Sequence, residues 1–307
     1  MKNKKLLTAV LCISIGCIML VATAFASSSG TTGYEAYKSA LKATAEAKSF
    51  TAGVSVEVKD NDMLLGSADL LMKASGLETG NFSMNGTIKA DSQEKSFEMY
   101  QQIGKIVIKT SDSDIYYVSS NDLRDSRTNS YDINHDPNAV KAGEAVVDAL
   151  VGNLKDYFIV SAGADGGSTV DFHITGSQIP AVVNAVTSLC AKEKTMGAGQ
   201  QTVNYTGTGM PPFMEGLHVT TPKLTDDVRV DEISISAEID GSGVITSQTI
   251  QTAVSGKDAD GNQHQVSVII DMVLSGLGST AADTIDLEGK QTQTVDFEKI
   301  KGPAVMN

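Results

Sequence analysis

The residues whose spacing comes closest to a chemical site lie between 258 and 264. Their sequence, Asp-Ala-Asp-Gly-Asn-Gln-His, places oxygen ligands at alternate positions, as an EF-hand calcium loop does. Such a loop needs Gly at its sixth position and Glu at its twelfth, where this sequence has Gln263 and Ile269. A hairpin turn explains the same residues, so we predict a turn here and no metal site.

The histidines give no pattern for metal binding or catalysis. They are His135, His173, His218 and His264, and no two of them are four residues apart, as zinc ligands on a helix would be. The sequence also has no G-x-S-x-G motif, which marks the nucleophile of many hydrolases. We therefore predict a non-enzymatic protein with no catalytic residues and no cofactor.

The most regular pattern in the chain is an alternation of apolar and polar residues from Phe50 to Val118. A period of two predicts antiparallel strands with one buried face, and the Asp-, Asn- and Gly-rich turns between the runs predict hairpins. A helix is expected before them, at residues 34–48, because its large apolar residues recur at spacings of three and four.

The second half of the chain repeats this order. Pro137 follows Asp136, a helix-start signal, and Ser177 is expected to cap a second helix. The predicted elements are a helix at 137–154, strands at 158–162 and 168–175, a helix from 177, a long loop at 195–227, strands at 233–239, 244–254 and 266–274, and a short strand containing Ile285 and Leu287. In the first half, the last two strands are predicted at 105–110 and 115–119.

These elements predict an α+β fold, in which a strongly curved antiparallel sheet, a half-barrel, packs on a few helices. We expect one domain at residues 34–290, with two halves, 34–120 and 138–290, as the alternative. Residues 27–33 are expected to form a linker and residues 291–307 a C-terminal tail.

The N-terminus predicts export. Three lysines precede a nearly unbroken apolar run from Leu6 to Phe25, and Ala24-Phe25-Ala26 is typical of a signal-peptide cleavage site. We expect cleavage after Ala26 and a location outside the cell or on the outer face of its envelope. Two alternatives remain: an uncleaved anchor, which would hold the protein near the membrane, and lipidation at Cys17.

The net charge of the chain argues against a nucleic-acid partner. The chain has a net charge of -13, and without the three lysines of the predicted signal peptide 21 basic residues face 37 acidic ones, a net charge of -16. Such a surface repels nucleic acid, so we expect no nucleic-acid partner. The composition predicts no particular oligomeric state. Cys190 would be the only cysteine of the mature chain, and we interpret it as a core residue.

The apolar strand faces supply the candidate site. Methionine is adaptable and suits surfaces that accept variable apolar ligands. One interpretation is a filled core, and the other is a cavity for acyl chains. The residues predicted to line that cavity are Val54, Val56, Leu70, Met72, Met84, Ile88, Phe97, Met99, Val268, Ile270 and Met272.

A helix, a long meander, two helices separated by a hairpin and a second meander follow the export signal. This layout, over about residues 34–287, resembles the lipoprotein-carrier superfamily, which includes the LolA-like periplasmic carriers and the LppX-like lipid-carrier lipoproteins. The resemblance implies a half-open barrel that carries a lipid or a lipidated protein in the envelope of a bacterium, here of Gram-positive character. The alternative is an envelope or surface interaction module with a filled core and no small-molecule ligand.

Overall fold

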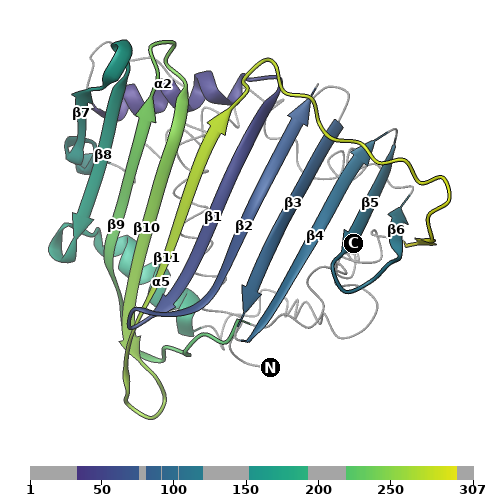
Figure 1. The fold of residues 1–307 in the computed structure, drawn as a ribbon. Helices are drawn as coiled ribbons and strands as arrows, with labels where there is room; N and C mark the ends of the chain where they lie inside the picture. Colours follow the sequence, from purple (N-terminus) through teal and green to yellow (C-terminus); the bar gives the residue numbers. More distant parts are fainter. Residues whose placement is uncertain are drawn as a thin grey trace, which may run out of the picture.

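The computed structural model of the chain describes residues 33–75, 81–90, 92–102, 104–119, 152–192 and 219–295. Within these ranges the fold is one large sheet of 12 strands with two α-helices (Figure 1). The α-helices are α2 (Gly33–Ala45) and α5 (Ala181–Lys192), and the short 3-10 helices are η2 (Gly152–Tyr157), η3 (Ala164–Gly166) and η4 (Gly176–Gln178). The strands are β1 (Phe50–Asp60), β2 (Met63–Ser75), β3 (Asn81–Ala90), β4 (Gln93–Gln102), β5 (Lys105–Thr110), β6 (Tyr116–Ser119), β7 (Phe158–Ala162), β8 (Ser168–Thr175), β9 (Asp226–Ile239), β10 (Ile245–Lys257), β11 (Gln263–Ser275) and β12 (Thr292–Thr294).

The strand order is β12-β6-β5-β4-β3-β2-β1-β11-β10-β9-β8-β7, so the sheet has two edges and is not closed into a barrel. The strands pair antiparallel except for β12, which lies parallel to β6. The pairing of β1 with β11, from Thr51 opposite Ser275 to Asp60 opposite Val266, joins the two predicted meanders into one sheet. The prediction of a large antiparallel sheet with few helices is confirmed.

Alternation along each strand gives the sheet two different faces. We call the face that carries Val54, Val56 and Val58 of β1 the apolar face, and the face that carries Ser55 and Glu57 the polar face. In Figure 1 α2 and α5 lie behind the sheet, on the apolar face. The β1–β2 turn is a tight two-residue turn, in which Asn61 and Asp62 both have positive φ (47° and 66°), as a type I′ hairpin requires. Next to this turn the pairing shifts by one residue between Val58 and Lys59, so the regular register begins at Val58 opposite Gly66.

The core lies between α2 and the strands of the second half. Tyr34 and Tyr37 of α2 are fully buried, and their rings lie 5.3 and 5.7 Å from the ring of Phe158 in β7. Phe158 stacks in turn on Phe172 of β8 at 4.5 Å. The buried cluster continues over β9, β10 and β11 to β1. Burial of this apolar surface is the main force that holds α2 against the sheet.

Polar contacts attach α5 to the neighbouring strand. The backbone N–H of Val230 in β9 donates to Asn184 Oδ1 at 2.8 Å, and Ser188 Oγ donates to the carbonyl of Val228 at 2.8 Å. Among the described residues, α5 packs mainly on β9, and α2 packs mainly on β7, β8 and β10. No helix among the described residues is long and apolar enough to cross a membrane.

After β11 the chain crosses the polar face near the ends of β1 to β4 before it reaches β12 (yellow in Figure 1). We call residues 276–291 the strap. Side chains of the strands hold its backbone: Ser83 Oγ accepts from the N–H of Asp283 at 2.9 Å, and the amide of Gln102 bonds both the N–H and the carbonyl of Ile285, at 2.8 and 2.6 Å. Lys73 also forms an ion pair with Asp283 at 2.9 Å.

Two element predictions are wrong. Ile285 and Leu287 lie in the strap and not in a strand, because the strap bonds to side chains where a strand would bond to backbone. Ser177 does not begin α5 but lies in η4; Ile179 before Pro180 is extended (φ -68°, ψ 120°), as the proline ring requires, so α5 begins after Pro180.

Several predictions concern residues outside the described ranges. They are the signal peptide, Cys17, nearly all of the linker at 27–33, the helix at 137–154 up to residue 151, most of the loop at 195–227, His135, His218 and the tail beyond Val295. The short strand β12 lies within the first residues of the predicted tail.

Candidate functional site

The strand register places all eleven predicted ligand-binding residues on the apolar face. Met72, Met84 and Met99 are directly opposite one another on β2, β3 and β4. Val54 lies opposite Leu70 on one side and Met272 on the other, and Val56 lies opposite Ile270. The remaining members, Ile88, Phe97 and Val268, alternate in step with these.

This set divides into two parts. Val268 and Ile270 are buried in the core, Val54 and Val56 pack against it, and Met272 on β11 is half-buried. The other part lies on β2 to β4, which are not among the strands that the described helices mainly contact. Its half-buried residues are Leu70, Met72, Met84, Ile88 and Met99.

Phe97 is the exception on these strands, with 3 % of its surface exposed. Its ring and the side chain of Leu70 converge over Gly86, where a Cβ would lie 3.2 Å from Phe97 Cε1 and 2.5 Å from Leu70 Cδ2. Gly86 is therefore a glycine because its two cross-strand neighbours fill the space above it.

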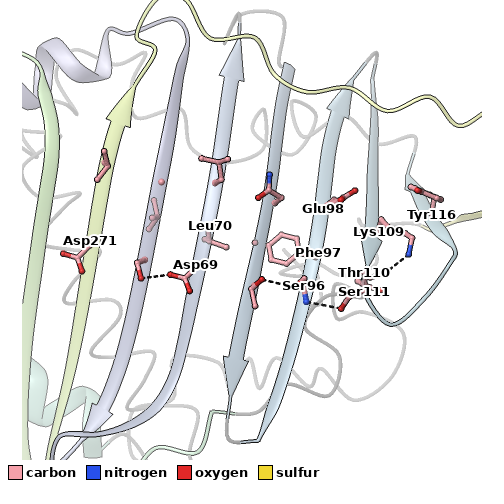
Figure 2. A pocket seen from close by; sticks show the side chains of 18 residues that line it. Asp69, Leu70, Ser96, Phe97, Glu98, Lys109, Thr110, Ser111, Tyr116 and Asp271 are labelled. Carbon is pink, nitrogen blue, oxygen red and sulfur yellow. Dashed lines mark hydrogen bonds between the residues drawn. The ribbon is translucent and has the colours of Figure 1, made fainter.

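A hollow of about 820 Å³ opens on the other, polar face, above β11, β1, β2, β3, β4, β5 and β6 (Figure 2). Two neighbouring rows of residues run across these strands. The first row is Asp271, Ser55, Asp69, Thr87, Ser96 and Ser111, and the second is Val273, Gly53, Leu71, Asn85, Glu98, Lys109 and Tyr116. Val54, Leu70 and Phe97 of the predicted site also border the hollow, although the strand register assigns them to the apolar face.

Hydroxyls and carboxylates pair along the first row. Ser55 Oγ donates to Asp69 Oδ1 at 2.8 Å, and Thr249 of β10 donates to Asp271 Oδ1 at 2.6 Å. Thr87 and Ser96 share a hydrogen bond of 2.8 Å. Cross-strand pairs of this kind stabilise a sheet, and here they also fix the orientation of each carboxylate.

The charge of the hollow is negative. Its lining contains the carboxylates of Asp69, Glu98 and Asp271 and one ammonium group, that of Lys109. Lys109 bonds the carbonyls of Thr110 and Ser113 at one end of the hollow.

Next to the hollow, Tyr100 donates its hydroxyl to Glu98 Oε2 at 3.0 Å. Burial and this bond to Glu98 together raise the pKa of Tyr100 to about 12, because both disfavour its ionised form. Tyr100 therefore remains a neutral hydrogen-bond donor to Glu98 at any physiological pH.

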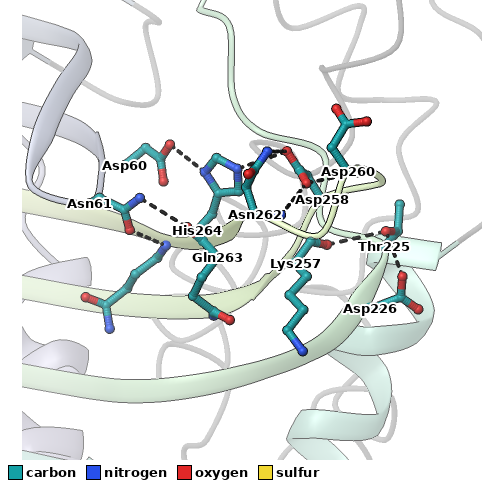
Figure 3. A network of polar contacts seen from close by, with 11 residues as sticks. Asp60, Asn61, Thr225, Asp226, Lys257, Asp258, Asp260, Asn262, Gln263 and His264 are labelled. Carbon is teal, nitrogen blue, oxygen red and sulfur yellow. Dashed lines mark hydrogen bonds and ion pairs between the residues drawn. The ribbon is translucent and has the colours of Figure 1, made fainter.

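A second polar cluster lies where the β1–β2 and β10–β11 hairpins meet (Figure 3). His264 is between two carboxylates, with its Nδ1 2.8 Å from Asp60 Oδ2 and its Nε2 3.3 Å from Asp258 Oδ2. Burial favours the neutral ring, but the bonds to Asp60 and Asp258 outweigh it and raise the pKa of His264. The cluster clamps one end of the β1–β11 pairing.

The calcium-loop candidate lies in the same cluster and forms a hairpin turn, as predicted. Asp258 Oδ1 accepts hydrogen bonds from the backbone N–H groups of Asp260 and Asn262, at 3.0 and 2.8 Å. The Asn262 side chain also donates to Asp258 and holds the pKa of Asp258 at about 2. Across the described ranges, no three His, Cys, Asp or Glu side chains are placed to hold a metal ion.

Sequence reasoning missed the hollow, because its two rows require β11 to lie beside β1, more than 200 residues away along the chain. Its only signal in the sequence is the Ser, Thr and Asp residues at the polar positions of the alternation. No protein-family model matches this chain, and no curated protein is significantly similar to it.

Proposed function

We propose that this chain is a non-enzymatic binding protein or carrier for a lipid, or for another apolar ligand, in the bacterial cell envelope. The observation that carries the proposal is the apolar face of β2 to β4, where Met72, Met84 and Met99 form a half-buried row. Methionine packs around ligands of different shape, so this row suits an acyl chain better than a rigid ligand.

The dimensions support a ligand of this class. From β11 to β4 the predicted residues span four strand spacings, about 19 Å, which is the scale of a lipid acyl chain. Each buried CH₂ group contributes about 0.8 kcal/mol, so a long chain provides more free energy than the binding entropy costs. In this proposal the sheet curves into a half-barrel around the ligand.

The alternative function is an interaction module with a filled core. The position of the hollow favours it, since the hollow opens on the polar face and its lining of hydroxyls and carboxylates does not suit an acyl chain. The two functions make different predictions for the two faces of the sheet, which can be tested separately.

The proposal includes export. Cleavage after Ala26 would release a mature chain that begins at Ser27. Intact-mass measurement of the protein from the culture medium and from the envelope fraction distinguishes this form from an uncleaved anchor and from a chain acylated at Cys17.

Titration with a fluorescent fatty acid tests the function. We expect saturable binding by the parent protein and loss of binding in Met84→Glu, because a carboxylate on the apolar face would oppose an acyl chain. Leu71→Glu is the matched control: Leu71 lies on β2, points to the polar face and is 39 % exposed, so this variant should bind like the parent. No binding by the folded parent, or equal loss in both variants, would reject the apolar face as the site.

A further inference from the structure

We propose that the hollow on the polar face is a second binding site, which takes an extended basic peptide segment of a partner protein. This site lies on the opposite side of the sheet from the proposed lipid site. The inference is independent of the lipid proposal, because the side chains on which it rests, those of Asp69, Glu98 and Asp271, lie on the polar face.

The hollow has room for a ligand. Its floor is open at Gly53, where a Cβ would meet no atom within 4 Å. The exposed side chains of Leu71 (39 %) and Val273 (59 %) flank Gly53 on the two neighbouring strands. A volume of about 820 Å³ lies within the range of ligand pockets, and the hollow extends over seven strands, from β11 to β6.

The carboxylates that line the hollow favour a cationic ligand. In the described part of the chain, each of Asp69, Glu98 and Asp271 uses one carboxylate oxygen to accept a hydroxyl and forms no ion pair. The other oxygen of each remains available to a ligand, and the hydroxyl bond fixes the direction in which the carboxylate points. With Lys109 the lining has a net charge of -2, which favours a cationic ligand.

The spacing of these carboxylates favours an extended ligand. Asp271, Asp69 and Glu98 lie on β11, β2 and β4, so neighbouring carboxylates are two strands apart, about 10 Å across the sheet. Glu98 lies in the second row, two residues further along its strand, which makes its separation from Asp69 about 12 Å. A polyproline II peptide repeats every three residues, about 9 Å, so long basic side chains at every third position can reach these carboxylates. Apolar side chains between them would contact Leu71 and Val273. A single metal ion or a compact amine would satisfy only one carboxylate at this spacing.

Fluorescence anisotropy with a labelled peptide tests the proposal. The probe is Lys-Leu-Pro-Lys-Leu-Pro-Lys, and the comparison peptide has Glu in place of each Lys. We expect the parent protein to bind the lysine probe and not the glutamate peptide, with an affinity that falls as salt is raised. The double variant Asp69→Asn with Glu98→Gln should weaken binding about tenfold, because two charge-assisted hydrogen bonds are lost.

Two further variants provide the controls. Asp171→Asn removes a carboxylate that accepts a serine hydroxyl in the same way, from Ser236 at 2.6 Å, but lies on β8 outside the hollow, so binding should not change. Gly53→Val should fill the floor and reduce binding while the protein keeps its melting temperature, since the site has room for the side chain and valine favours strands.

The proposal is overturned if the parent does not bind the lysine probe, or if the glutamate peptide binds equally well. It is also overturned if Asp171→Asn weakens binding as much as the double variant does, which would show attraction to the whole acidic surface. Spermidine is tested as a competitor at the same amine concentration as the unlabelled peptide. If spermidine displaces the probe as well as the unlabelled peptide does, the hollow binds small cations and the peptide proposal is rejected.

Discussion

Replacing Met84 by alanine separates a carrier from a filled core. The substitution removes three side-chain atoms from a residue that lies between Met72 and Met99 on the apolar face. A fully buried methionine changed to alanine costs about 2–5 kcal/mol, because the lost contacts leave a cavity. Met84 is only half-buried and its neighbours are flexible, so we expect the free energy of unfolding to fall by about 1 kcal/mol or less.

Urea unfolding followed by circular dichroism measures this change. Ile174→Ala provides the scale: Ile174 is fully buried in the core, and its loss should cost about 2–5 kcal/mol. The slope of the free energy with urea should be the same in both variants if each unfolds as the parent does. If Met84→Ala destabilises the protein as much as Ile174→Ala, the apolar face of β3 is part of a filled core, and the reasoning that leads to a lipid site is refuted.

Two further predictions concern the polar contacts that hold the sheet and the strap. Because its contacts raise the pKa of His264, His264 contributes stability that is complete below its ordinary pKa, about 6.5, and is lost as pH rises through its higher folded value. His264→Gln should therefore lower the melting temperature more at pH 5 than at pH 9; a pH-independent effect of this substitution would disprove the clamp. Gln102→Ala removes both hydrogen bonds to Ile285 and should speed amide exchange in the strap, at a cost of about 1–2 kcal/mol locally, while the exposed Gln93→Ala leaves exchange unchanged. Unchanged exchange in Gln102→Ala would show that the strap is held by other contacts.

Local patterns predicted the strands well. The predicted bounds of β5, β7 and β8 agree with the structure. In β8 the buried Val170, Phe172 and Ile174 alternate with exposed residues, whereas in β5 three consecutive residues are buried and in β7 only Phe158 is. Local patterns failed where contacts from distant parts of the chain determine the backbone conformation of a segment. Ile285 and Leu287 alternate like a strand, yet their segment is held by side chains of β3 and β4.

For the candidate site, too, local patterns predicted some features, whereas others depend on contacts between distant parts of the chain. Alternation alone predicted that eleven apolar residues would share a face, but only the pairing of β1 with β11 brings Met272 beside Val54. That pairing also brings Asp271 and Val273 to the edge of the hollow. A contact between strands so distant along the chain depends on the fold as a whole, and no local pattern encodes it.

Native mass spectrometry of the protein purified from its producing cells, without detergent, tests the proposed carrier function most directly. The account predicts a population whose mass exceeds that of the polypeptide by one lipid, which is released on collisional activation and is absent from the Met84→Glu variant. Polypeptide mass alone in the parent, together with no uptake of added fatty acid, would contradict the carrier and leave the interaction module.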